Sequence, residues 1–444
     1  MDRPGDGSRC DPTERASERV RAASVDVAGD VRSDLHDPAR RDNRERCASL
    51  DPGQSAHHAR RSGVGYQRLR AGAIGTWAAI GGTGFGVGPV VGGVLLTFFG
   101  WSSVFWANIP FAAVAITLTL IAVPESRNPS SRRLDLLGVA FSALGLVGLT
   151  LGLIEASSHP WTSIAVLGPL LVGAALLVCF VHWERRTAEP MIPPALLAAR
   201  SFVSASGVYL VSYAAFGAFM YYLTLLYQDV NGWSPLKTGL SWLFMNVPFL
   251  LMAQLTGRID RRHPPARVVS TGCLVAAIGI FVLSRADATS PFVHTALGYV
   301  LAGIGFGTIV PGVTHIAMRD VPAGVSGAGS GVVNASRQLG TSIGLAVLGS
   351  IGVTASTSHW HNAIHRLPAS AHVAASAQTQ NVAGAHISAV THALGPAYRH
   401  TAIQSFVQGF HLALGIAAAL VLAAAITALL GFRKPATASD VLIP

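Results

Sequence analysis

The amino-acid sequence predicts an all-α polytopic membrane protein with about ten transmembrane helices, and three observations support this fold class. Half of the 444 residues are hydrophobic and only 12% are charged, whereas charged residues make up about 25% of a typical soluble domain. Apolar segments of roughly 20 residues, long enough to cross a bilayer core, follow one another from residue 71 onward. Basic residues gather in alternate connections between these segments, as they do in multi-span membrane proteins.

The first 70 residues differ in composition from the rest of the chain. They contain 14 Arg, 12 Asp or Glu and no Lys, and they show neither helical nor strand periodicity. Such a segment buries too little apolar surface to offset the entropy of ordering, so a disordered tail is expected. Its net charge of +2 (14 minus 12) argues against a nucleic-acid partner, although a regulatory or RNA-binding arm is the alternative.

The membrane-spanning part begins after this tail. Hydropathy and segment length predict ten spans. They cover residues 72–98, 103–123, 134–155, 163–183, 201–226, 235–256, 268–284, 293–315, 337–356 and 405–431.

The basic residues of the connections predict how these spans are oriented. One set of alternate connections, together with the C-terminal end, holds 14 Lys or Arg residues, and the opposite set holds four. The positive-inside rule therefore places both chain ends in the cytoplasm of a multi-pass protein of the cell (plasma) membrane. An even number of spans agrees with this orientation.

One outer connection, residues 357–404, is long and rich in histidine. It contains no Asp, Glu or Cys beside its seven His residues. A polar outer loop is the preferred interpretation, and a metal site is not expected.

A glycine-rich stretch, GTWAAIGGTGFGVGPVVGG at 75–93, opens the first span. Glycine allows close helix packing in lipid, where no hydrophobic force drives helices together, and proline bends the helix. The order of these residues resembles the antiporter motif on the fifth helix of the fourteen-helix drug:proton antiporter branch of the major facilitator superfamily. The matching positions are Gly75, Gly84, Gly88, Pro89, Gly92 and Gly93.

Further segments resemble the same family over about residues 70–432. They include WSSVFWANIPFA at 101–112, VPESR at 123–127, YLTLLYQDVNGWSPLKTGL at 222–240 and SGVVNASRQLGTSIGLAVLGSI at 330–351. The resemblance implies a partial major facilitator fold, since the glycine motif marks a fifth helix and arrives first. We therefore expect the first four helices to be missing, and our hypothesis is that residues 1–70 come from an out-of-frame or misassigned start.

This numbering divides the chain into five parts. They are the tail (1–70), a remnant of the N-terminal bundle with helices 5 and 6 (71–125), two linking helices (126–195), a C-terminal six-helix bundle with the His-rich outer loop (196–432) and a cytoplasmic tail (433–444).

The stretch GRIDRRHPPAR at 257–267 resembles the family's cytoplasmic loop motif. The expected role is a charged latch formed by Gly257, Asp260 and Arg261. Asp260 would lie near a helix N-terminus, and Arg261 would pair with a carboxylate across the bundle interface. Solvated positive-inside charge is the alternative.

Coupling and cavity residues are expected among the ionisable and aromatic side chains of the spans. Glu155 is the candidate proton carrier, with an interfacial residue as the alternative, and Arg337 faces either the cavity or the headgroups. Candidate cavity aromatics, for which core packing is the alternative, are Tyr213, Phe216, Phe219 and Tyr222.

The predicted function is proton-coupled efflux of drug-like amphipathic small molecules by alternating access. The alternative is a truncated, non-transporting fragment of such an exporter. No enzyme activity, catalytic residue, metal or cofactor is expected, because no nucleophile elbow, zinc motif or phosphate-binding lysine is present. The expected partners are the lipid bilayer, a small-molecule substrate and the proton as coupling ion, and the sequence does not predict an oligomeric state.

Overall fold

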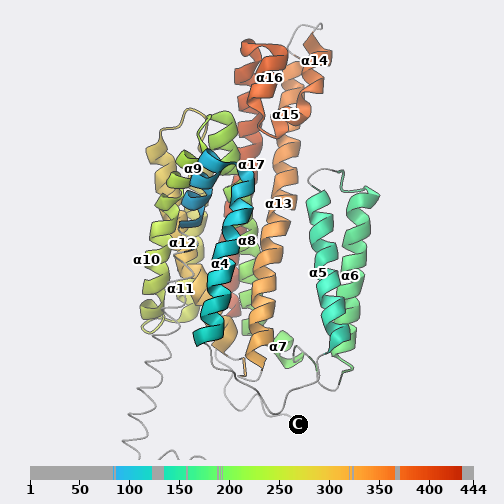
Figure 1. The fold of residues 1–444 in the computed structure, drawn as a ribbon, viewed down its shortest axis with the longest axis vertical. Coiled ribbons are helices and arrows are strands. Elements are labelled where there is room, and N and C mark those ends of the chain that lie inside the picture. Colours follow the sequence, from blue (N-terminus) through green and yellow to red (C-terminus); the bar gives the residue numbers. More distant parts are fainter. Residues whose placement is uncertain are drawn as a thin grey trace, which may run out of the picture. The chain divides into compact units, whose positions relative to one another are not determined.

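The computed structural model describes residues 84, 87–122, 135–156, 159–187, 190, 192, 194–319, 321–322, 325–365 and 371–432. All of them belong to one unit, Gly75–Pro444. Every regular element in this part of the chain is helical, which confirms the all-α prediction (Figure 1).

The helices follow the expected order. Nine of those described are long and apolar enough to cross a membrane, and a shorter apolar helix, Val87–Phe99, precedes them. The first predicted span, 72–98, thus begins outside the described residues. After Val87–Phe99 the elements are α4 (Trp101–Ala122), α5 (Leu136–Glu155), α6 (Ile164–Glu184), α7 (Pro194–Ala198), α8 (Arg200–Leu225), the π-helix η1 (Leu226–Val230), α9 (Pro235–Ser241), α10 (Leu243–Ile259), α11 (Pro265–Ser284), α12 (Phe292–Arg319), α13 (Ser326–Ile364), α14 (His372–Ala377), α15 (Thr379–Ala383), α16 (Ile387–Leu394), the 3₁₀ helix η4 (Pro396–Tyr398) and α17 (Arg399–Gly431).

Local sequence explains how the span at 235–256 is built from two helices. Ser234 precedes α9 and its hydroxyl accepts the backbone N–H of Lys237 at 3.2 Å, while Pro235 occupies the first helical turn. Both are favoured helix-start features. The helix continues after Trp242 as α10, so α9 forms the N-terminal end of one 25-residue span, Pro235–Ile259.

The core lies among α8, α10, α11, α12, α13 and α17. The helix α8 packs on α13 and α17, α11 packs on α12 and α17, and α10 packs on α12 (Figure 1). Glycine allows the closest of these approaches. A Cβ on Gly340 or Gly344 of α13 would overlap the backbone of Leu210 or Ala214 in α8, so these two helices meet backbone to backbone.

The helices α5 and α6 form a hairpin beside α13. Asp135 caps α5 by accepting the N–H of Gly138 at 2.9 Å, and it also accepts the indole N–H of Trp183 at 2.9 Å. The connection between the two helices reaches α13, because the indole N–H of Trp161 donates to Ser350 at 2.8 Å.

The outer connection is mostly helical, which corrects the loop expected at 357–404. The helix α13 is 39 residues long and continues to Ile364, and α14, α15 and α16 follow it (Figure 1). We name α14, α15, α16 and the outer end of α13 the outer cap. Trp360 is fully buried there and donates to the carbonyl of Ala375 at 3.0 Å. The hydropathy of this segment is too low for a span, but its short helices still bury apolar side chains such as Val390.

Candidate functional site

The helix Val87–Phe99 meets α9 through backbone contacts. A Cβ on Gly93 would lie 2.8 Å from the carbonyl oxygen of Pro235 and 2.9 Å from the Cα of Leu236. On the other side, a Cβ on Gly239 would overlap the carbonyl of Pro89. Only glycine fits at these two positions, so the two helices lock together through Gly93 and Gly239.

The other described glycines of the motif lie on a different face. Gly84, Gly88 and Gly92 follow one another at intervals of four and so share one side of the helix. A Cβ on any of them meets no described atom within 4 Å. Gly75 lies outside the described residues. The structure therefore separates a packed pair of motif residues, Pro89 and Gly93, from an open glycine face.

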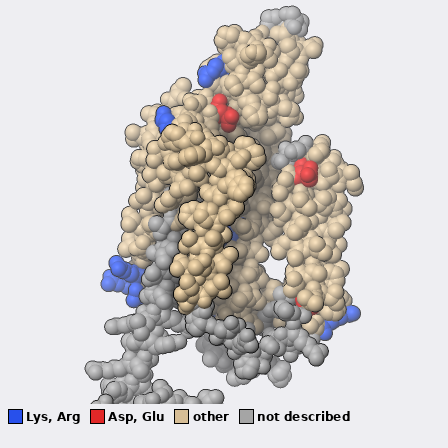
Figure 2. All heavy atoms as spheres, in the orientation of Figure 1, with Lys and Arg blue, Asp and Glu red and all other residues tan. Residues whose placement is uncertain are grey.

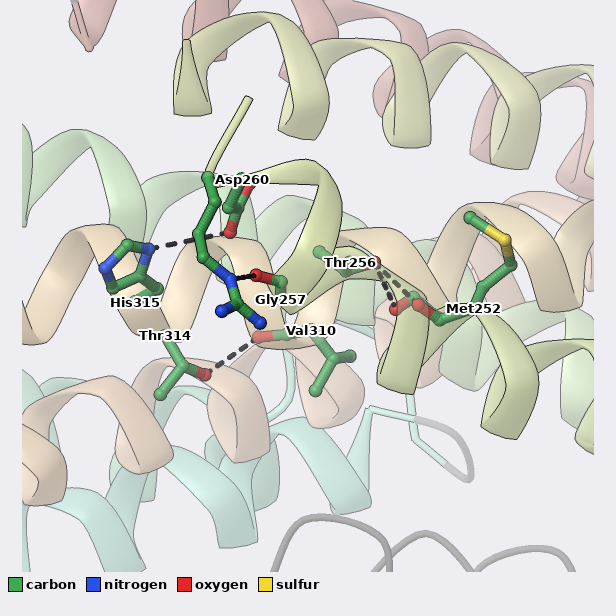
Figure 3. A network of polar contacts seen from close by, with 9 residues as sticks. Met252, Thr256, Gly257, Asp260, Val310, Thr314 and His315 are labelled. Carbon is green, nitrogen blue, oxygen red and sulfur yellow. Dashed lines mark hydrogen bonds and ion pairs between the residues drawn. The ribbon is translucent and has the colours of Figure 1, made fainter. Parts of the chain in front are cut away.

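The predicted latch region lies at the end of α10. Asp260 follows the last turn of this helix, and its side chain is only 7% exposed. One carboxylate oxygen lies 3.5 Å from Nδ1 of His315 in α12, whose side chain is 57% exposed (Figure 3). The other oxygen is buried and has no hydrogen-bond partner among the described residues. A protonated His315 is therefore the cation available to Asp260 within this part of the chain.

The expected latch partners are thus corrected in two respects. Asp260 lies at the C-terminal end of α10 rather than near a helix N-terminus. Arg261 is exposed, and its Nε donates at 3.2 Å to the carbonyl of Gly257, one turn earlier. The described structure shows no carboxylate beside Arg261, because Asp260 faces α12 instead (Figure 3).

Aromatic side chains from α8 and α12 form a cluster in the interior of the bundle. Tyr213 and Phe216 are half-buried, with ring centroids 5.5 Å apart, and Phe306 lies 5.1 Å from Phe216. Phe219 is fully buried behind them, against Phe306 and Trp242. Of the four predicted aromatics, Tyr213 and Phe216 are accessible on this surface.

Tyr222 has a different place. It is buried, and its hydroxyl donates to the carbonyl of Gly349 at 3.1 Å in α13. Its ring also packs edge-on against Phe410 of α17. Tyr222 therefore fits core packing among three helices, the alternative considered for these aromatics.

Arg337 lies deep in α13, eleven residues after Ser326. At 1.5 Å per residue this is about 16 Å from the start of the helix, well inside α13. Its guanidinium carbon lies 5.4 Å above the ring of Tyr213, and one terminal nitrogen donates to Oδ1 of Asn334 at 3.0 Å. The sequence placed Arg337 at the inner end of a span because polar residues 326–336 conceal the start of α13.

Glu155 is the last residue of α5. Its carboxylate lies 3.1 Å from Nδ1 of His159, and both side chains are substantially exposed, at 42% and 50%. This position matches the interfacial alternative for Glu155 better than that of a proton carrier inside a span.

The helices around Arg337 carry no acidic residue. None of the helices α8, α10, α11, α12, α13 and α17 contains an Asp or a Glu. On the face drawn in Figure 2, charged side chains lie mainly toward the ends of the helices, with a broad uncharged surface between them. Within the described structure, Arg337 thus lacks a carboxylate partner from the helices that surround it.

Comparison with known proteins identifies the family. The sequence profile described as "Major Facilitator Superfamily" matches residues 66–345, which is well over half of the chain. The chain belongs to the Major Facilitator Superfamily. The resemblance noted from the glycine motif is confirmed, and the protein is a multi-pass membrane protein of a transporter family rather than of an enzyme family.

Curated relatives in this superfamily carry drug-resistance names. "Multidrug resistance protein Stp" of Mycobacterium tuberculosis is 32% identical over 283 residues, covering 64% of this chain and 52% of the relative. "Tetracenomycin C resistance and export protein" of Streptomyces glaucescens is 29% identical over 280 residues, covering 62% and 52%. "Methylenomycin A resistance protein" of Streptomyces coelicolor is 32% identical over 299 residues, covering 66% and 61%. The chain spans about half the length of the curated relatives that it matches.

Two residues of these sites were not predicted from the sequence. His315 is the partner of Asp260, and Phe306 completes the aromatic cluster. A histidine inside an otherwise apolar span is a signal that could have identified His315, since ionisable residues in spans commonly have a role. Phe306 offers no such signal, because one aromatic residue in an apolar helix looks like any other core residue.

Proposed function

We propose that this chain belongs to a proton-coupled exporter of drug-like amphipathic small molecules in the plasma membrane, with both chain ends in the cytoplasm. The observation that carries the proposal is the locked pair formed by the helix Val87–Phe99 and α9. A glycine-proline helix that meets its neighbour backbone to backbone can release it without rearranging large side chains. Alternating access requires contacts of this kind, which form in one state and break in the other.

The substrate class follows from the side chains along the bundle interior. The half-buried aromatic rings of Tyr213 and Phe216, backed by the fully buried ring of Phe306, offer an apolar surface in the interior of the bundle. Such a surface suits flat, partly apolar molecules. The drug-resistance names of the relatives support the same class.

Efflux of a neutral amphipathic dye tests this function. The chain is expressed in bacteria that lack their main efflux pumps, and the cells are loaded with Nile red. We expect faster dye loss than in empty-vector cells, and we expect a protonophore to abolish the difference because the proton gradient is the proposed energy source.

A matched pair of glycine variants links efflux to the locked pair. Gly239→Ala places a methyl group on the carbonyl of Pro89 and should slow efflux at least fivefold, whereas Gly168→Ala in α6 meets open space and should have no effect. Dye retention equal to the empty vector refutes transport by these 444 residues and supports the non-transporting alternative. Efflux that persists with the protonophore refutes proton coupling alone.

A further inference from the structure

Arg337 has more hydrogen-bond donors than its described contacts use, and it lies within a helix long and apolar enough to cross a membrane. A guanidinium carries five N–H donors, and the described partners of Arg337 are the amide oxygen of Asn334 and the side chain of Tyr213. A charged group in the middle of a membrane usually pairs with another group or serves a function.

The surrounding helices do not supply a counter-charge. The helices of the bundle core contain no carboxylate, as shown above, and Asp229 and Asp260 lie outward and inward of it, at the ends of α8 and α10. The guanidinium is also half-exposed, on the same side as the accessible rings of Tyr213 and Phe216. A positive charge and an apolar aromatic surface are therefore adjacent.

We propose that Arg337, Tyr213 and Phe216, supported from behind by the buried Phe306, form a binding site for aromatic small molecules that carry an acidic group, a carboxylate or phenolate. This inference rests on the proposed export function and names the substrate class of that site. The anionic group pairs with the guanidinium by charge-assisted hydrogen bonds, which gain strength away from water. The accessible ring of Phe216 contacts the aromatic body of the ligand, and the buried ring of Phe306 supports Phe216 from behind.

The site has a geometry suited to both contacts. The guanidinium carbon lies 5.4 Å from the centroid of the Tyr213 ring, while Asn334 accepts a hydrogen bond from one terminal nitrogen at 3.0 Å. This arrangement leaves the remaining donors free to meet a planar carboxylate, for which the guanidinium fork is well shaped. Phe216 packs against both Tyr213 and the fully buried ring of Phe306, so that α12 supports the apolar surface that α8 presents.

Two dyes that share a ring system and differ in charge test the proposal. Fluorescein is anionic near pH 7.5 and rhodamine 123 is cationic, and both contain a xanthene ring. Binding of each dye to the full chain in phosphatidylcholine nanodiscs is measured by fluorescence anisotropy. We expect fluorescein to bind at least tenfold more tightly than rhodamine 123.

Variants then assign the preference to Arg337. Arg337→Gln should weaken fluorescein binding about tenfold and change rhodamine 123 binding less than twofold. Arg337→Lys should retain part of the preference, because the charge remains and the fork is lost. The matched control is Arg258→Gln, an exposed arginine at the inner end of α10, which should leave both dissociation constants unchanged.

Each contrary result has a definite meaning. Equal binding of the two dyes, absence of binding, or a preference that survives Arg337→Gln would overturn the proposal. Displacement of fluorescein by phosphatidylglycerol in the nanodisc would also overturn it, by identifying a lipid headgroup as the occupant. If Arg337→Gln fails to fold, the wild-type preference and Arg337→Lys still decide. Nile red efflux without any charge preference would leave the export function standing while this inference falls.

Discussion

Replacing Gly93 by alanine is the most direct test of the locked pair between the helix Val87–Phe99 and α9. The added Cβ would lie 2.8 Å from the carbonyl oxygen of Pro235 and 2.9 Å from the Cα of Leu236. Ordinary contacts of this kind are at least about 3.4 Å, so the two backbones must separate by roughly half an ångström or more. Neither neighbour is the end of a flexible side chain that could move aside.

The magnitude follows from the cost of overpacking. Inserting one methyl group into a tightly packed contact typically costs about 1–3 kcal/mol. Because each 1.4 kcal/mol corresponds to a factor of ten, the population of the packed state should fall about 5- to 150-fold relative to the separated state. The neighbouring variant Gly92→Ala adds the same methyl group where no described atom lies within 4 Å, so its effect should be negligible.

Thiol labelling measures the separation. A Leu236→Cys substitution places a reporter directly beneath Gly93, and its reaction rate with a membrane-impermeant maleimide rises when the helix Val87–Phe99 leaves α9. We expect the rate to increase at least fivefold with Gly93→Ala and to stay unchanged with Gly92→Ala. Equal rates in the two variants would show that the contact does not limit the separation of the helices, and the reasoning would fail.

Three further predictions concern stability and pH. In α13, Gly344→Ala puts a methyl group on the carbonyl of Ala214, whereas the methyl group of Gly349→Ala meets open space. Gly344→Ala should therefore lower the free energy of unfolding by about 1–3 kcal/mol, and Gly349→Ala should not lower it. Thermal melting in detergent measures this difference, and a melting temperature that falls more for Gly349→Ala would contradict the packing described. His315→Gln removes the cation beside Asp260. Since histidine ordinarily titrates near pH 6.5, the variant should lose more melting temperature relative to wild type at pH 5.5 than at pH 8. A loss of melting temperature that grows with pH would exclude the ion pair. Burial raises the pKa of the Asp287 carboxyl, but hydrogen bonds from Thr289 and Ser290 outweigh this effect and hold the pKa below its usual value. The ionised Asp287 carboxylate therefore stabilises the fold above about pH 4. The difference in melting temperature between wild type and Asp287→Asn should shrink as the pH falls through the lowered pKa.

The fold class and the order of the spans were predictable because they depend on composition and length. Apolar runs mark α8, α11 and α17 within a few residues of their observed bounds. The limits of α13 were not predictable from hydropathy, since the helix begins and ends in polar sequence. Trp360 illustrates the reason: its burial depends on α14, which lies later in the chain.

The candidate sites show the same division between local and tertiary information. The spacing of the glycine motif identified the family, yet only the structure distinguishes Gly93, which contacts α9, from Gly92, which does not. Likewise, the sequence offered Tyr213 and Tyr222 as equal candidates. Their separation into an accessible and a buried residue depends on which face of α8 meets α13, and Gly340 and Gly344 determine that face.

The length of α13 has a mechanical consequence. Its 39 residues form a rod of about 58 Å, which carries Arg337 in its inner part and Trp360 of the outer cap near its other end. A tilt of about 10° around the inner end would move the outer end by roughly 10 Å, while displacing Arg337 by only about 3 Å. Small changes of tilt near Arg337 are therefore magnified at the other end of α13, and a fluorophore attached to the outer cap would report them.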